Sequence, residues 1–350
     1  MIQDQKYGVE IELTGLTRQR AAEVIADYFG TSYTHVGGAY DPYTVRDSSN
    51  RTWKLVSDGS IECKDKYGNP KDKSYSVEFV TPICTYDDIP VIQQIVRELR
   101  HNGAIADKSC GIHVHVNGAP FDARSLRNLT NIMRAKEDLI YKALNVNPAR
   151  ENRFCKKVDE RFLEELNRKK PKTLDRIQDI WYQGHDGSNI HYHLSRYRAL
   201  NLHSLFSKGT IEYRLFDSTT HAGRIKTYIQ FCLAISNQAL SQSCASYRKM
   251  QSTNEKYTFR TWLLRLGMIG DEFKTARMFL LENLDGCIAW KDPAQAIEQR
   301  ERLRIAKQMA QTKQSEETEE QQEKEQSAPT DGQQDAEQDE EETMPMGLAM

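Results

Sequence analysis

The sequence predicts an α+β protein in which helices cover one face of an antiparallel sheet and the other face stays open. Three observations support this class. Several short segments alternate apolar and polar side chains, as half-buried strands do. Longer segments have the apolar spacing of amphipathic helices. The 350 residues contain no glycine-rich phosphate loop of the GxxxxGK[ST] or GxGxxG type, so any nucleotide chemistry must use another scaffold.

The first predicted strand is the segment YGVEIEL near the N-terminus. Val9, Ile11 and Leu13 would lie on one of its faces, and Glu10 and Glu12 on the other. The elements expected after it, up to residue 103, are a helix capped by Thr17, strands at 51–56 and 75–80, and a helix opened by Asp87 and Asp88.

The middle of the chain holds two further predicted strands. In CGIHVHVNG, His113 and His115 alternate with apolar residues, and in GTIEYRLF, Glu212 and Arg214 share one face. The other elements expected here are a long helix at 124–144 and a charged, partly helical insertion or lid at about 146–193. The elements expected after residue 216 are an apolar helix at 222–240, amphipathic helices at 259–268 and 273–283, and a charged helix from Pro293.

Composition excludes several classes of protein. The chain has no apolar run of about 18 residues and its start lacks the regions of a signal peptide, so we expect a cytoplasmic protein that does not span a membrane. Its seven cysteines are scattered and form no CxxC pair, which favours reduced thiols over a disulfide framework or a zinc knuckle.

Charge divides the chain into two parts. Residues 311–350 contain 13 acidic and 2 basic side chains and almost no aromatic or β-branched ones, a composition typical of disorder. The remaining 310 residues carry a net charge of +9, although the whole chain has a formal charge of -2. We therefore expect a folded domain at 1–310, with C-terminal helices at about 245–310, and a disordered acidic tail at 311–350.

Charged or metal-binding side chains recur on one face of the predicted strands. They are Glu10, Glu12, Glu78, His113, His115, Glu212 and Arg214. For any single pair, a solvated strand face is the simpler explanation. Four carboxylates on one sheet face would repel each other unless cations neutralise them, and oxygen-rich sites suit Mg²⁺ or Mn²⁺. An arginine beside such a site typically holds a phosphoryl group, so the set as a whole predicts phosphoryl transfer.

Six motifs in order carry a resemblance to a known family. The segments YGVEIE, DGS, VEFVTP, CGIHVHVN, RYRALN and GTIEYRLF, followed by an apolar helix, resemble the putative amidoligase family over residues 6–239. The resemblance implies the fold of glutamine synthetase and glutamate-cysteine ligase, with a concave catalytic face on the antiparallel sheet. It also implies an ADP-forming ligase that uses Mg-ATP to phosphorylate a substrate carboxylate, and an amine that then displaces phosphate to give an amide.

The resemblance assigns expected roles to individual residues. The expected metal ligands are Glu10, Glu12, Glu78, His113 and Glu212. The residues expected near the nucleotide or substrate are His115, Arg198 and Asn201, and Arg214 is expected to stabilise the phosphoryl group. The implied partners are a carboxylate and an amine substrate, each an amino acid, a peptide, a cell-wall peptide or a protein.

Asp58 and Ser60 lie in the DGS turn before the second glutamate strand. Asp58 is a candidate to orient or deprotonate the incoming amine, because an ammonium group must lose a proton before it attacks. The alternative is that Asp58 and Gly59 only form a turn. The second HxH pair, His191 and His193, fits a contact of the lid better than a metal site.

Three other functions remain open at the level of sequence. A zinc hydrolase could use His113 and His115, but a (β/α)₈ hydrolase needs a regular alternation of strands and helices that the charged insertion lacks. A kinase could use the same Mg-ATP face. Binding of nucleic acid is disfavoured, because the basic charge is spread over three helices without an aromatic and basic stripe.

Overall fold

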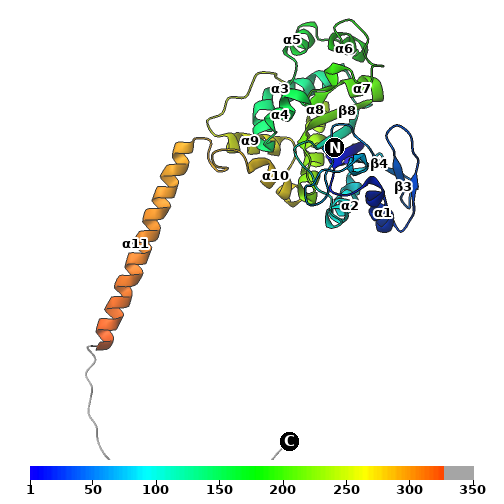
Figure 1. Ribbon diagram of the computed structural model, residues 1–350. Coiled ribbons are helices and arrows are strands. Elements are labelled where there is room, and N and C mark those ends of the chain that lie inside the picture. The colour runs from blue at the N-terminus through cyan, green and yellow to red at the C-terminus, as the bar shows by residue number, and fades with distance from the viewer. Residues whose placement is uncertain (327–350) are drawn as a thin grey trace, which may run out of the picture. The chain divides into compact units, whose positions relative to one another are not determined.

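One eight-stranded sheet organises the protein (Figure 1), and its strand order is β2-β3-β4-β5-β1-β6-β8-β7. The computed structural model describes residues 1–326. Every pair of neighbouring strands in this sheet is antiparallel, which confirms the predicted α+β class and antiparallel sheet. The strands are β1 (Tyr7–Leu13), β2 (Tyr33–His35), β3 (Tyr43–Arg46), β4 (Thr52–Val56), β5 (Val77–Val80), β6 (Gly111–Asn117), β7 (Leu200–Asn201) and β8 (Thr210–Asp217).

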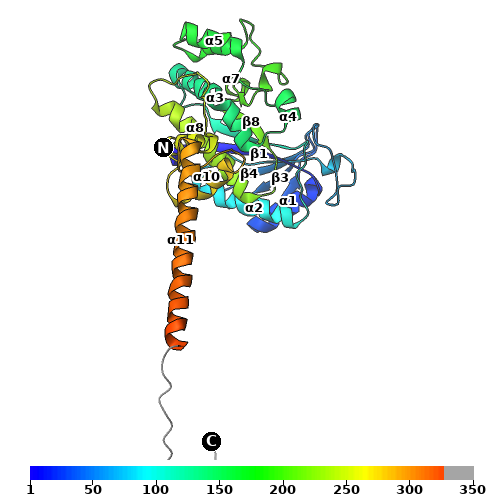
Figure 2. The ribbon, with the colours of Figure 1, turned by 90° about the vertical axis from the view of Figure 1, so that its left-hand side faces the viewer.

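Helices pack around this sheet and complete a compact unit that spans Met1–Pro293. The central helix α8 contacts α2, α3 and α10 as well as strand β6. In both ribbon views α1 and α2 lie below the strands and α5 lies above them (Figures 1 and 2). The helices are α1 (Arg18–Phe29), α2 (Ile89–His101), α3 (Ala123–Leu144), α4 (Pro148–Arg153), α5 (Glu160–Lys169), α6 (Leu174–Trp181), α7 (His203–Lys208), α8 (Ala222–Ser241), α9 (Glu255–Arg265), α10 (Lys274–Leu281) and α11 (Pro293–Gln326).

Alternation along β1 separates the core from the open face. Val9, Ile11 and Leu13 are each at most 1% exposed and belong to the core, whereas Glu10 and Glu12 point to the other face. Burial of apolar side chains therefore fixes which way the glutamates point. A shift of one residue in register would move them into the core, where unpaired charges are costly.

Most predicted elements are present close to their expected bounds. Thr17 caps α1, because its side chain accepts a hydrogen bond from the backbone N–H of Arg20. The insertion forms the three short helices α4 to α6, which agrees with a partly helical segment. The structure adds three strands that the sequence did not predict, namely β2, β3 and the two-residue β7.

The C-terminal region differs from the expectation in two respects. The compact unit ends at Pro293 instead of about residue 310. Helix α11 continues to Gln326, so residues 311–326 are helical where we expected disorder. The physical reason is that Glu, Gln and Lys are strong helix formers, even in a segment that has too few apolar residues for a core. Residues 327–350, which make up the rest of the expected tail, lie outside the described residues.

Two further expectations concern membranes and cysteines. Within residues 1–326, no helix combines the length and the apolar character needed to cross a bilayer. In that same range no two cysteines form a disulfide, and Cys84, Cys110, Cys155 and Cys232 are buried. These four thiols therefore act as small apolar side chains of the interior.

Candidate active site

Carboxylates and imidazoles converge on the open face of the sheet. Glu10 lies at the centre of this cluster: its Oε2 is 3.1 Å from Nδ1 of His113, and its Oε1 is 3.3 Å from Nε2 of His115. Oε1 of Glu212 is 3.7 Å from Nδ1 of His113 and 4.0 Å from Nε2 of His115. Four side chains from three strands thus lie within contact distance of one another.

Strand register explains this convergence. Glu10 of β1 is paired with His113 of β6, and His115 of β6 is paired with Glu212 of β8. On the other side of β1, Glu12 is paired with Glu78 of β5. Because directly opposite residues of antiparallel strands point to the same face, these pairings place all six side chains on one surface.

A β-bulge lies at the edge of the cluster. In the pairing of β6 with β8, Ile112 is opposite Phe216 and Val114 is opposite Tyr213, so two residues of β8 lie opposite His113 alone. One of these two is Arg214. A bulge bends its strand and re-aims the side chains beside it, and bulges are common next to functional sites.

Three groups of side chains have the geometry of a cation site. In each group the ligand atoms lie within 4.8 Å of one another. The groups are Glu10 with Glu78 and His113, Glu10 with His115 and Glu212, and Glu12 with Asp58 and Glu78. All five residues expected to bind metal therefore belong to such groups, together with His115 and Asp58, for which we expected other roles.

Crowding of buried carboxylates shifts their pKa values in opposite directions. Burial, followed by repulsion from Glu10 and Glu12, raises the pKa of Glu78 well above its ordinary value. Burial also raises the pKa of Glu12. For Glu212, burial is outweighed by the combined attraction of Arg214, His115 and His113, which lowers the pKa of Glu212 to about 2. The cluster thus holds more negative charge than its own cations neutralise.

Glu212 is held in place by two donors. Nη1 of Arg214 donates to its Oε1, and Nδ2 of Asn201 donates to its Oε2 at 2.6 Å. Asn201 is opposite Glu212 in the pairing of β7 with β8, so the short edge strand positions this donor. Among the described residues, Oδ1 of Asn201 and Nε of Arg214 are buried without a hydrogen-bond partner. Buried unpaired groups of this kind are typical of a site that a ligand completes.

Two small cavities flank the cluster. One, of about 200 Å³, is lined by Glu12, Glu78, Asp58, Ser60 and Arg214 among others. The other, of about 260 Å³, includes Glu212, Asn201, His203 and Lys208 in its lining. Arg196 lines both cavities and separates them.

The DGS turn contributes directly to the first cavity. Oδ1 of Asp58 accepts hydrogen bonds from the backbone N–H of Ser60, at 2.6 Å, and from the Ser60 hydroxyl. The turn is anchored by Ser76, whose hydroxyl accepts from the backbone N–H of Asp58 at 2.9 Å. Asp58 therefore both forms the turn and faces the carboxylate cluster. Its role in the turn is thus compatible with the expected role in orienting or deprotonating the amine.

Comparison with known protein families agrees with the resemblance read from the sequence. A family model described as "Putative amidoligase enzyme" matches residues 3–236. The chain belongs to this family. A search of the curated proteins found no match. Family membership supports an enzyme of the ligase type, and the matched region contains all of the strands and both cavities described above.

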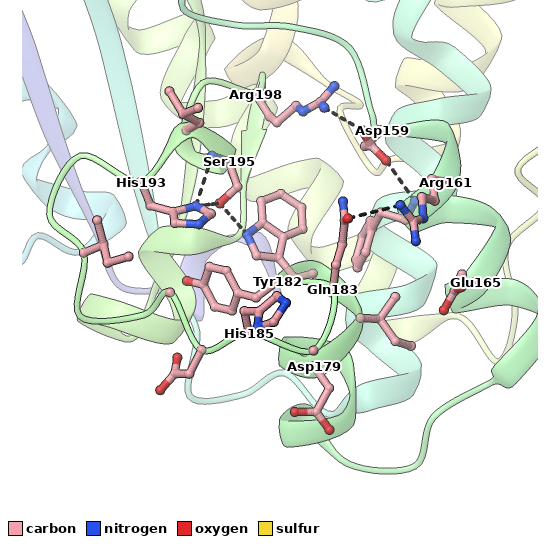
Figure 3. Close-up of a pocket in the computed structure, with 18 of the residues that line it drawn as sticks. Asp159, Arg161, Glu165, Asp179, Tyr182, Gln183, His185, His193, Ser195 and Arg198 are labelled. Atoms are coloured by element: carbon pink, nitrogen blue, oxygen red, sulfur yellow. Dashed lines mark hydrogen bonds and ion pairs between the residues drawn. The ribbon is translucent and has the colours of Figure 1, made fainter.

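Arg198 lies away from the cluster of carboxylates and imidazoles. Its guanidinium donates to the backbone carbonyl of Lys157 at 2.9 Å and to Oδ2 of Asp159 at 2.6 Å. Figure 3 shows it at a larger cavity of about 760 Å³ within the insertion, whose lining includes His193 but none of the clustered carboxylates. Arg198 thus holds the insertion together, while Asn201 of the same motif reaches the site.

The second histidine pair lies in the loop between the cavities. Nδ1 of His193 is 2.7 Å from Oγ of Ser195, and its ring stacks on that of His203. His191 lines the 260 Å³ cavity, as Lys208 does. These contacts are those expected of a lid segment. They agree with the interpretation of His191 and His193 as lid contacts, which the sequence favoured over a metal site.

Sequence reasoning missed two arginines of the site. Arg150 of α4 and Arg196 of the loop before β7 both line the 200 Å³ cavity. Arg150 is 4% exposed, and its Nε lies 3.1 Å from Oδ1 of Asp217. Arg196 opens the RYRALN motif, which was the available signal for it. No spacing connects Arg150 to the glutamate strands, because the insertion reaches the sheet only through tertiary packing.

Proposed function

We propose that the protein is an ATP-dependent carboxylate-amine ligase that forms an amide or peptide bond through an acyl-phosphate intermediate. One observation carries the proposal: in a member of the amidoligase family, side chains from four strands form a buried acidic cluster with Arg214 directly beside it. The substrates are a carboxylate and an amine, carried by an amino acid, a peptide or a protein.

The donor set fits magnesium or manganese. Candidate ligands are mostly carboxylate oxygens, and the raised pKa of Glu78 reflects negative charge that a cation would neutralise. The residues that would hold the metal are Glu10, Glu12, Glu78, His113 and Glu212. When bound, Mg²⁺ would offset the charge that builds up as an anionic carboxylate approaches anionic ATP.

In the first proposed step, a carboxylate oxygen of the substrate bonds to the γ-phosphorus of ATP. The bond from that phosphorus to the bridging oxygen breaks, and ADP leaves. Arg214 is fixed by its ion pair with Glu212, so its guanidinium is oriented before the reaction begins. We assign to it the stabilisation of the transferring phosphoryl group, with His115 and Asn201 positioning the reactants beside Glu212.

In the second step, the amine nitrogen bonds to the carbonyl carbon of the acyl phosphate. The bond from that carbon to the phosphate oxygen breaks, and inorganic phosphate leaves. Asp58 takes up the proton of the amine, because it lines the cavity and only its Oδ1 is engaged by the backbone and hydroxyl of Ser60.

An activity assay on the full-length protein tests this proposal. With ATP and Mg²⁺, the protein should release ADP, and release should rise when a suitable carboxylate and amine are supplied together. The substitutions Glu12→Gln and Arg214→Ala should each lower the rate by about 100-fold or more, since each removes charge from the centre of an electrostatically driven step.

The matched control is Glu62→Gln. Glu62 is an exposed acidic residue that follows the DGS turn and pairs with Lys64, and it does not line the cavity. Its replacement should leave the rate unchanged. Hydroxylamine should trap the acyl phosphate as a hydroxamate. ADP release without hydroxamate would favour a kinase, and ATP-independent hydrolysis that needs zinc would favour a hydrolase.

A further inference from the structure

The 200 Å³ cavity has walls of opposite character. The sheet and its DGS turn contribute mostly carboxylates, together with His113 and Arg214. The insertion contributes Arg150, Phe154 and Tyr192, and the segment that follows it contributes Arg196 and Tyr197. An anion that enters the cavity therefore meets guanidinium groups on the side of the insertion.

An ion pair, one long hydrogen bond and packing on a ring place Arg150 on this wall. Its Nε lies 3.1 Å from Oδ1 of Asp217, its Nη2 donates to the carbonyl of Phe216 at 3.4 Å, and its Cζ lies 5.9 Å from the ring centre of Phe154. Its guanidinium packs closely over Gly111, where an added Cβ would be only 2.8 Å from Cζ. The group is therefore buried, charged and oriented without a ligand.

Arg196 approaches the cavity from the segment that follows the insertion. Its Nη1 donates to the carbonyl of His191 at 3.1 Å, and its guanidinium lies 5.5 Å from the ring centre of Tyr192. No carboxylate of the described residues forms an ion pair with Arg196. Unlike Arg214, which is engaged by Glu212, its charge is available to an incoming anion.

We propose that the insertion and the segment that follows it supply an oxyanion-binding subsite in which Arg150 and Arg196 hold either the substrate carboxylate or the phosphoryl group transferred to it. This inference rests on the proposed ligase function, and it gives this part of the chain a direct role in binding a reacting group. Planar guanidinium groups match two-oxygen anions in geometry. The acidic cluster would repel the same anion, so the arginines are needed to admit it.

Binding of two small anions to the full-length protein tests the subsite. Inorganic phosphate is titrated by ³¹P NMR and acetate by saturation-transfer NMR, each with and without Mg-ADP. We expect Arg150→Gln and Arg196→Gln each to lower the affinity of the protein for at least one of the two anions by about tenfold or more. A selective loss of acetate would identify the substrate carboxylate as the bound group, and a selective loss of phosphate the phosphoryl group.

Controls separate a local effect from unfolding. Arg153→Gln changes an exposed arginine of the same helix outside the cavity, and should bind both anions like the unmodified protein. Affinity for Mg-ADP should be unchanged in all variants. If Arg150→Gln fails to fold, Arg150→Lys replaces it, because this variant keeps the positive charge. The subsite would be overturned if neither anion binds the unmodified protein, or if both anions bind Arg150→Gln or Arg196→Gln as tightly as they bind the unmodified protein. Absence of Mg-ADP binding would instead contradict the ligase proposal.

Discussion

At the scale of single residues, Glu78 shows how burial and neighbouring carboxylates change the pKa of a side chain in the site. It lies opposite Glu12 and in the same candidate cation groups as Glu10 and Asp58. Burial and these neighbours raise its pKa well above the ordinary value of about 4.3. In the metal-free protein Glu78 therefore keeps its proton at a pH where an exposed glutamate has lost it.

This raised pKa predicts that metal binding depends on pH. A metal ion binds the deprotonated carboxylate, so below the raised pKa it must displace a proton, and its affinity should rise with pH. In the metal-free protein, the stabilisation that Glu78 contributes is present at low pH and is lost as pH rises through its raised pKa. The increase in unfolding temperature caused by Mg²⁺ should therefore become larger as pH rises from the ordinary range of glutamate through the raised pKa of Glu78.

Thermal unfolding with and without Mg²⁺ at several pH values measures this coupling. In Glu78→Gln, which has no proton to release at this position, the pH dependence should weaken markedly. Calorimetry in buffers of different ionisation enthalpy should show proton release on metal binding by the unmodified protein. A Mg²⁺ effect that stays constant with pH would show that Glu78 is not a ligand.

At the scale of elements, the loop at 187–198, here called the strap, partitions the region above the sheet. Its residues line all three cavities. The hydroxyl of Tyr192 lies 3.2 Å from that of Tyr40, which joins the strap to the loop between β2 and β3. On its other side, His193 packs edge to face on Tyr182. The strap thus closes the site through a few side-chain contacts.

Gly187→Ala should loosen the strap. An added Cβ would lie 2.7 Å from Cδ2 of His193 and 2.9 Å from the ring of Tyr182, so these packed rings must move. We expect a loss of about 1–3 kcal/mol in stability, as is usual for overpacking, together with a higher KM for the substrates. Hydrogen exchange should become faster in the strap, with α8 as the internal reference. Exchange that increases equally in α8 would indicate global destabilisation instead.

At the scale of the whole molecule, the chain divides into two units, and the C-terminal helix α11 does not belong to the compact unit that holds the sheet. The unit that spans Met1–Pro293 contains the sheet and the candidate site. In α11, large apolar side chains such as Ile297, Leu303 and Met309 are 63% to 67% exposed. They therefore contribute little burial to the stability of the protein.

Truncation after Met309 should preserve folding and activity. The removed segment includes the 13 acidic side chains of residues 311–350, and its apolar content is too low to support a core. The unfolding temperature and the rate of ADP release should match those of the full-length protein. Loss of activity in a truncated protein that remains folded would assign the acidic tail a role in catalysis or substrate binding.

The sequence by itself determined the alternating strands and the chemistry that they carry. Periodicity located β1, β5, β6 and β8, because burial of one face leaves the other to polar side chains. The same periodicity predicted that Glu10, Glu12, Glu78, His113 and Glu212 share a surface. The order of the six motifs then identified the family, which the match to residues 3–236 confirms.

Only the tertiary structure decided which distant residues complete this surface. The bulge at His113, the edge strand that brings Asn201 to Glu212, and the approach of Arg150 depend on packing between segments far apart in the chain. It also placed Arg198, a neighbour of Asn201 in sequence, at another cavity. Local periodicity reports which face a residue occupies, but not which other segment that face will meet.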